Sequence, residues 1–419
     1  MRLRIFLFFV FAPIISFAQI IDLFQDYQLQ DSTQWTFGIR THVFNNSTAL
    51  TARVLNTAFY GGYIDTEQKN NILSRADEIN TSGSSLNTSI YVAKRISHFR
   101  NQETFGLSVF GKIADRQENL AMFNDKALQL IFNGNKQFTG QTISLDPLEY
   151  NQFRYSQFQV GISKDFKSGN GFTVGASFLY GHNNRHITSD RMDILISETG
   201  DRLSTDAEFT IHETDPNNPN FFEYNGAGFS IDLEGRFAVQ LVSDSSNPGT
   251  FHFSVSDLGF IQWHGTSLQT EVDTFYSFTG INIENIFDPN SPTTGSPQNL
   301  WDSISVQSKQ AYILNIPNTI HFYLEQNIQK FRLTMGGAHR NKAYYYPYFY
   351  GKCGYLVAKN LTLTGQLNYG GYGKFGGGIE ILHESESHSL KLGSTNIEGF
   401  LAPDQWAGQS IYFQIAAKL

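Results

Sequence analysis

The chain has 419 residues, of which only 16 % are charged and 15 % are aromatic, and its formal net charge is −8. Few charges with 37 Phe, 20 Tyr and 36 Gly argue against a disordered or nucleic-acid-binding chain. The mean hydropathy is slightly negative, which excludes a bundle of transmembrane helices. The composition instead suits strands that face lipid or pack closely against one another.

The N-terminus has the pattern of a secretory signal peptide. Arg2 and Arg4 supply positive charge, residues 5–15 form a short apolar core, and Ser16-Phe17-Ala18 offers a small-residue cleavage site. The apolar core is too short to span a bilayer, and no other stretch approaches ~18 uninterrupted apolar residues. We therefore expect residues 1–18 to be removed after Ala18. The exported chain would then enter a membrane only as a β-barrel.

Apolar and polar residues alternate with a period of two in about fourteen segments, which is typical of barrel strands. In the last segment Ile411, Phe413 and Ile415 fall on one side, and Tyr412 and Gln414 on the other. An alternating strand that ends at the final residue is how outer-membrane barrels usually close. The expected strands lie at residues 35–44, 87–96, 105–113, 157–163, 174–180, 229–237, 251–255, 320–324, 331–335, 349–357, 361–369, 379–381, 390–392 and 410–419.

The connections between these segments alternate in length. Every even-numbered connection is short, and the odd-numbered ones include four long polar segments, in which Thr66–Ile79 looks helical. Outer-membrane barrels have short periplasmic turns and long extracellular loops. We therefore predict an all-β protein, a transmembrane antiparallel barrel of about 14 strands. A periplasmic segment would cover residues 19–34 and one barrel domain residues 35–419, with long extracellular loops at 45–86, 114–154, 182–226 and 261–317.

Five stretches carry a family resemblance. The most specific is Ser256–Trp263, with Asp257, Leu258, Gly259, Phe260 and Trp263, and we expect Asp257 to end a strand and fix a turn. Together the stretches resemble an uncharacterised family of Bacteroidota outer-membrane barrels, a domain of unknown function of the 5723 type. A more distant similarity is to barrel-like accessory proteins of type IX secretion and gliding. The resemblance implies a barrel and no catalytic residue. The other stretches are 60–65, 155–161, 172–181 and 225–233.

Charged residues share the polar face of several expected strands, and in a barrel this face lines the lumen. The sharpest group, Asp232, Glu234 and Arg236, lies on a strand whose other face is apolar. Such residues could line a pore or form ion pairs that fill a closed interior, and we favour ion pairs. The mixed signs argue against strong ion selectivity. The candidate lumen-lining residues are Arg40, Asp232, Glu234, Arg236, Glu325 and Arg332.

The aromatic run at residues 344–350 could be a ligand-stacking platform, but its position favours an interfacial girdle of Tyr345, Tyr346, Tyr348 and Phe349. His182 and His186 have the spacing of a helical metal pair, yet they follow an expected strand and lack a third ligand. No Gly-x-Ser-x-Gly elbow is present. We expect no metal, no cofactor and no catalytic residue.

Three functions compete for such a barrel. The first is a non-enzymatic structural or accessory component of an outer-membrane secretion or assembly complex. The second is a passive channel or transporter for small or hydrophobic solutes, and the third is a loop-borne enzyme or adhesin. We favour the first. The expected location is the bacterial outer membrane. The expected partners are outer-membrane lipid, the barrel-assembly machinery through residues 410–419, and outer-membrane proteins through the extracellular loops, with no nucleic acid.

Overall fold

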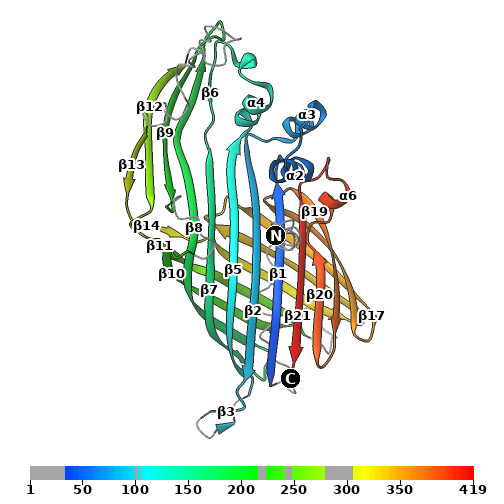
Figure 1. Ribbon diagram of the computed structural model, residues 1–419. Coiled ribbons are helices and arrows are strands. Elements are labelled where there is room, and N and C mark those ends of the chain that lie inside the picture. The colour runs from blue at the N-terminus through cyan, green and yellow to red at the C-terminus, as the bar shows by residue number, and fades with distance from the viewer. Residues whose placement is uncertain (1–33, 100–101, 104, 216–222, 241–247, 279–304) are drawn as a thin grey trace, which may run out of the picture.

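A closed antiparallel barrel of fourteen strands forms the body of the protein, as the sequence predicts (Figure 1). The computed structural model describes residues 34–99, 102–103, 105–215, 223–240, 248–278 and 305–419. The predicted signal peptide lies outside these residues, as does all of segment 19–34 except Gln34. The barrel strands are β1 (Trp35–Ser47), β2 (Ile79–Arg95), β5 (Leu107–Asn124), β7 (Glu149–Asp165), β8 (Gly171–Ile196), β10 (Gly226–Val239), β11 (Gly249–Trp263), β15 (Asn318–Ile328), β16 (Phe331–Asn341), β17 (Tyr346–Ala358), β18 (Leu361–Gly371), β19 (Phe375–Glu384), β20 (His388–Ser394) and β21 (Gln409–Lys418).

Closure is made by the first and last strands. Strands β1 and β21 pair without interruption from Thr36↔Lys418 to Asn45↔Gln409, and this pairing joins the first and last of the described barrel strands into a closed wall. Each of the other barrel strands pairs with the barrel strands before and after it in the chain. The fourteen segments that alternate in the sequence are therefore the fourteen strands of the wall.

The side chains of the wall point alternately outward and inward. On β21, Ile411 and Ile415 are about half exposed, whereas Tyr412 and Gln414 are buried in the interior. A sheet whose outer surface is apolar and whose inner surface is polar is stable when hydrocarbon surrounds it. This inside-out arrangement explains how a chain with modest mean hydropathy can form a membrane-spanning structure.

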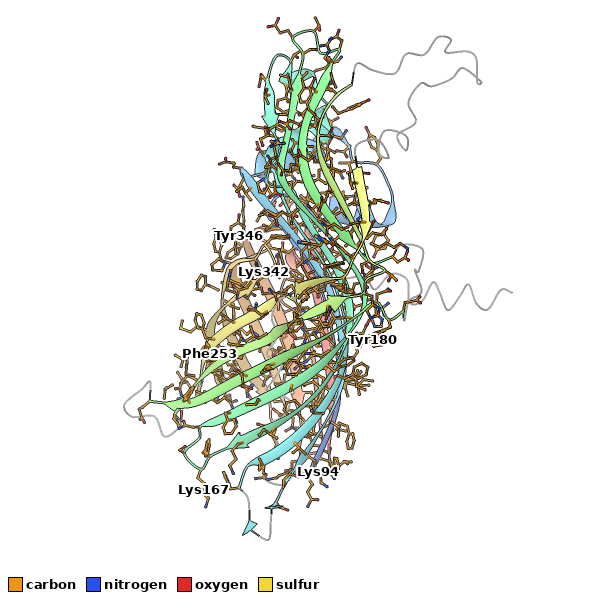
Figure 2. The ribbon with its side chains drawn as sticks, turned by 90° about the vertical axis from the view of Figure 1, so that its left-hand side faces the viewer. Lys94, Lys167, Tyr180, Phe253, Lys342 and Tyr346 are labelled. Carbon is orange, nitrogen blue, oxygen red and sulfur yellow. The ribbon has the colours of Figure 1, made fainter. Side chains whose placement is uncertain are left out.

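Aromatic side chains lie on the outer surface near both ends of the barrel. Lys94 and Lys167 lie at the short-turn end (Figure 2). Lys94 lies over the ring of Trp35, and Lys167 over the ring of Phe105. At the opposite end Tyr346 and Phe349 are about half exposed. Two aromatic belts around an apolar band mark the two membrane interfaces of an outer-membrane barrel. Only the second belt contains residues that the sequence assigned to a girdle.

A sheet rises above the barrel at the end that carries the long connections (Figure 1). The outer ends of β5, β7 and β8 extend beyond the wall, and β8 pairs there with an added strand from Ile196↔Leu203 down to Arg185↔Glu213. Segments 114–154, 182–226 and 261–317 are therefore not wholly loops, because they contain pieces of this raised sheet. The added strands are β6 (Thr142–Ser144), β9 (Leu203–Glu213), β12 (Leu268–Phe278), β13 (Ser305–Lys309) and β14 (Tyr312–Asn315).

Short helices lie at the same end of the barrel as the raised sheet. The expected helix at Thr66–Ile79 is α3 (Thr66–Arg75), which begins at a capping box formed by Asp65 and Gln68. Ala49, Val54, Ile72 and Leu128 pack together between the helices. Among the residues that the structure describes, none of the helices is long and apolar enough to cross a membrane. The other elements are α2 (Ala52–Tyr60), α4 (Asp125–Asn133), α6 (Glu398–Leu401), the 3₁₀ helix Lys136–Phe138 and a small hairpin of β3 (His98–Phe99) and β4 (Gln102–Glu103) at the opposite end.

Candidate functional site

An ion pair crosses the lumen from one wall to the other. One terminal nitrogen of Arg340 on β16 donates to both carboxylate oxygens of Glu118 on β5, at 2.8 and 2.7 Å. Five barrel strands separate β5 from β16 on one side (β7, β8, β10, β11 and β15) and seven on the other. Both side chains are at least 90 % buried. The contact can only be made across the interior.

Strand β5 supplies three charged groups of this region. Lys112, Arg116 and Glu118 lie on its inner face, and each is about 6 % exposed. Arg116 binds Asp257 on β11 at 2.5 Å, and Lys112 lies 4.0 Å from Asp232 on β10. Because charges removed from water are costly unless they are paired, these contacts neutralise a region that would otherwise be unstable.

Asp257 does not end a strand, which corrects the expectation from the sequence. It lies within β11 at a β-bulge, where Ser256 and Asp257 together oppose Asp232 of β10. Its φ of 60° lies in the left-handed region, which aspartate tolerates better than most residues. The bulge turns the Asp257 carboxylate into the lumen, where it also accepts from the Gln157 side chain at 3.2 Å. Its backbone N–H donates to Asp232 at 2.7 Å, so the two acidic residues form one structural unit.

Aromatic residues pack next to these ion pairs and complete a layer across the lumen. Phe44 on β1 contacts Tyr372, which follows β18, with ring centroids 5.7 Å apart. The ring of Tyr372 also covers Gly83 on β2, where an added Cβ would lie 2.4 Å from the ring. We call this set the luminal layer: the charged residues Lys112, Arg116, Glu118, Asp232, Asp257 and Arg340, and the packed residues Phe44, Leu120, Phe153, Tyr155, Leu179, Ile261, Trp263, Ile316, Ala338, Ala343, Tyr345, Tyr348 and Tyr372.

The aromatic girdle predicted from residues 344–350 is only half correct. Tyr346 and Phe349 are exposed on the outer surface, whereas Tyr345 and Tyr348 are buried in the luminal layer. Simple alternation fails because the turn contains a left-handed residue, Tyr344, and because the register of β17 shifts between Tyr346 and Phe349. The bulge places two residues that are three apart on the same outer face.

Several polar atoms in the luminal layer are buried and have no hydrogen-bond partner among the residues that the structure describes. They include the hydroxyls of Tyr345 and Tyr372, the indole nitrogen of Trp263, and Nε and one terminal nitrogen of Arg116. A buried donor that makes no hydrogen bond costs about 1–3 kcal/mol relative to its hydrated state. The closed arrangement of the layer is therefore opposed by these groups and favoured by its ion pairs and packing.

The six residues predicted to line the lumen all lie on inward-facing positions of their strands. Arg40 on β1 donates to Gln414 on β21 at 2.9 Å, and Asp232 belongs to the luminal layer. The remaining four lie nearer the short-turn end, where each contacts a charged or ionisable residue of an adjacent strand or of the next strand but one. Glu234 lies 3.6 Å from His252, Glu325 lies 3.9 Å from Arg332, and Arg236 binds Asp165.

The structure does not bring His182 and His186 together. Both lie on β8, where residues four apart are separated by roughly 13 Å along the strand. His182 instead makes a 2.8 Å hydrogen bond with Ser156. Within the described part of the chain, no group of three or more His, Cys, Asp or Glu side chains is placed to hold a metal ion.

Sequence reasoning missed Arg116, Glu118 and Arg340. The first two fall in segment 114–154, which the sequence predicts to be a long polar loop. The signal that could have found them is the period of two in β5, which continues past residue 113. The even-numbered positions of this strand face the lumen: Lys112, Ala114, Arg116, Glu118 and Leu120 are all buried, and the residues between them are more exposed.

The protein belongs to the family of unknown function DUF5723, whose model matches residues 29–385. No curated protein sequence matches the chain. Its fold is similar to that of a TodX monoaromatic hydrocarbon channel lacking S2 and S3 (8 % identity, 97 % of this chain and 95 % of that one, TM-score 0.46). It is also similar to the toluene transporter TodX of P. putida (8 % identity, 93 % and 89 %, 0.40) and the autotransporter NalP translocator domain of Neisseria meningitidis (8 %, 94 % and 92 %, 0.35). At this identity the likeness concerns the fold alone.

Proposed function

We propose that the protein is a non-enzymatic accessory component of an outer-membrane complex, whose barrel is closed in its resting state. The observation that carries this proposal is the luminal layer, in which Glu118 and Arg340 join opposite walls. Passive diffusion through a barrel needs a continuous path of water along the lumen. A layer of packed, buried side chains removes such a path.

The raised sheet supports the accessory role. It places folded structure well beyond the barrel rim, at the end with the long connections (Figure 1). Large apolar side chains are exposed there, including Phe275 (68 %) and Val306 (71 %). Apolar groups that remain in water in the isolated chain are characteristic of surfaces that bind another protein. In this proposal the barrel anchors the sheet and the sheet contacts the partner.

The test is chemical cross-linking of the native outer membrane followed by purification of the tagged full-length chain. We expect a stoichiometric outer-membrane or surface partner that is lost when Phe275 and Val306 are both changed to Ser. The matched control changes the lipid-facing Val160 to Leu, which keeps an apolar surface. Recovery of the wild-type barrel alone, under conditions that retain known complexes, contradicts the accessory role.

A second candidate function is a gated channel. It is favoured by buried donors that have no partner among the described residues, such as Tyr345, Tyr372 and Trp263, because water entering an opened lumen would satisfy them. In this case deletion of the protein slows the uptake of small solutes into intact cells. Unchanged uptake across a panel of ions and small apolar solutes removes this candidate.

A further inference from the structure

We propose that the Glu118–Arg340 ion pair is the latch of a gate, and that its release opens the lumen to small hydrated ions. The inference rests on the second candidate function, the gated channel. It assigns the release of the closed luminal layer to one contact. Conductance of the wild type and conductance of latch variants are separate measurements, so failure of the latch and failure of the closed-barrel proposal can be told apart.

The position of the pair makes it suited to this role. The other charged contacts of the luminal layer join strands that are closer neighbours: β5 and β10 have two strands between them, and β5 and β11 have three. Glu118 and Arg340 have five strands between them along the shorter path. Among these three pairs, only this one ties nearly opposite walls together, so its loss frees both sides of the lumen at once.

Two buried tyrosine rings next to the ion pair are held in place partly by Arg340. Tyr345 and Tyr372 lie close enough to the Arg340 guanidinium to interact with it electrostatically, and their rings contact each other with centroids 4.9 Å apart. Within the described part of the chain, neither hydroxyl has a hydrogen-bond partner. When Arg340 leaves Glu118, these rings lose a fixed neighbour, and hydration of their hydroxyls then favours movement away from the closed position.

The solute class follows from the charges that an open lumen would expose. Lys112 and Arg116 face Asp232 and Asp257, so cations and anions of the protein lie at the same level. A pore lined by both signs holds water and discriminates weakly between ions. We therefore assign small inorganic ions of either sign as the species that pass when the latch opens.

The experiment is single-channel recording of the purified full-length barrel in planar bilayers with potassium chloride. Removing one partner of a buried pair destabilises the paired state strongly, so Glu118→Gln should raise the fraction of time spent open on the order of 100-fold. Arg340→Gln should act in the same direction. Exchange of the two charges, Glu118→Arg with Arg340→Glu, should return the barrel to near silence, because it restores the pair.

The matched control is Asp206→Asn, which removes one partner of an ion pair of similar length on the raised sheet, outside the lumen. It should leave the barrel silent. Heat-modifiable gel mobility shows whether each variant is a folded barrel. If Glu118→Gln does not fold, Glu118→Asp keeps the charge but shortens the reach, and it should open the barrel to a smaller extent.

The proposal is overturned if folded Glu118 and Arg340 variants are as silent as the wild type. It is also overturned if the charge exchange conducts as often as the single variants, since the pair would then not be what closes the lumen. Steady conductance of the wild type contradicts the closed resting barrel itself, whatever the variants do.

Discussion

The lumen and the raised sheet use the same ionic chemistry in two different environments. Arg340 and Glu118 meet at 2.7 Å with both side chains at least 90 % buried. Arg191 on the raised sheet lies 2.9 Å from Asp206, 3.2 Å from Glu208 and 3.4 Å from Asp273, with every partner at least 39 % exposed. Burial, not the number of contacts, decides what each group contributes: water screens the surface pairs, whereas removal of one buried partner leaves a charge without compensation.

The sharpest test of this difference removes a luminal charge. Arg340→Ala leaves Glu118 buried without its partner, and we expect a loss of about 3–5 kcal/mol in the free energy of unfolding. Urea titration of the barrel in lipid vesicles, followed by gel mobility, measures this loss. A loss below about 1 kcal/mol would place Glu118 in contact with water and remove the distinction between lumen and surface.

A substitution that leaves the charge unaltered tests the packing of the lumen. Gly83→Ala adds a Cβ that would lie 2.4 Å from the buried ring of Tyr372. The ring must move, so we expect a destabilisation of about 1–3 kcal/mol, measured by the same titration. Gly365→Ala is the matched control, because an added Cβ there meets no atom within 4 Å. Equal losses of stability for the two variants would show that the ring of Tyr372 does not lie against Gly83 in the lumen.

The outer part of β8 offers a test by pH. Burial lowers the pKa of His186, which lies beyond the luminal layer, to about 4, below its ordinary value of 6.5. The neutral ring is favoured in the folded state, so its contribution to stability is complete above pH 6.5 and is lost as the pH falls from 6.5 to 4. We expect about 1–2 kcal/mol over this range, less than the full shift implies because solvent reaches part of the ring.

Hydrogen exchange of the β8–β9 amides between pH 7 and 4, corrected for intrinsic rates, follows this loss. His186→Gln should flatten the dependence, and the protection of the β1–β21 amides should change little in either protein. If the pH dependence of β8–β9 hydrogen exchange is the same in His186→Gln as in the wild type, groups other than His186 cause the pH response of the raised sheet.

The smallest effect is expected on the surface of the raised sheet. Asp206→Asn removes one of three carboxylates around the half-exposed Arg191, and we expect a change of less than about 1 kcal/mol. Thermal unfolding monitored at low and high salt measures it, and the change should shrink further at high salt. A loss of stability as large as that of Arg340→Ala would mean that water does not reach the ion pair of Arg191 and Asp206.

Much of the fold follows from local patterns in the sequence. Strands such as β21 alternate strictly, and the alternation of short and long connections sets the direction of each strand. The raised sheet escaped prediction because its strands lie in segments whose polar residues are also typical of loops. In Leu203–Glu213, for example, Asp206 and Glu208 lie on one face while Ala207 and Ile211 are buried on the other.

The luminal layer was harder to predict for a physical reason. Glu118 and Arg340 are 222 residues apart, and their contact depends on the diameter of the barrel rather than on any local pattern. Asp257 and Tyr348 were misplaced because a bulge changes which face a residue occupies, and a bulge leaves no clear mark in alternation. The inward face of each strand was predictable, whereas the partner across the lumen was not.

The central claim is that side chains of the luminal layer close this barrel. Single-channel recording of the purified wild-type protein in planar bilayers tests it most directly. The luminal layer predicts silence interrupted by rare, brief openings. A steady ohmic conductance in every inserted barrel would contradict the claim, because it requires a continuous path of water where Glu118 and Arg340 are in contact.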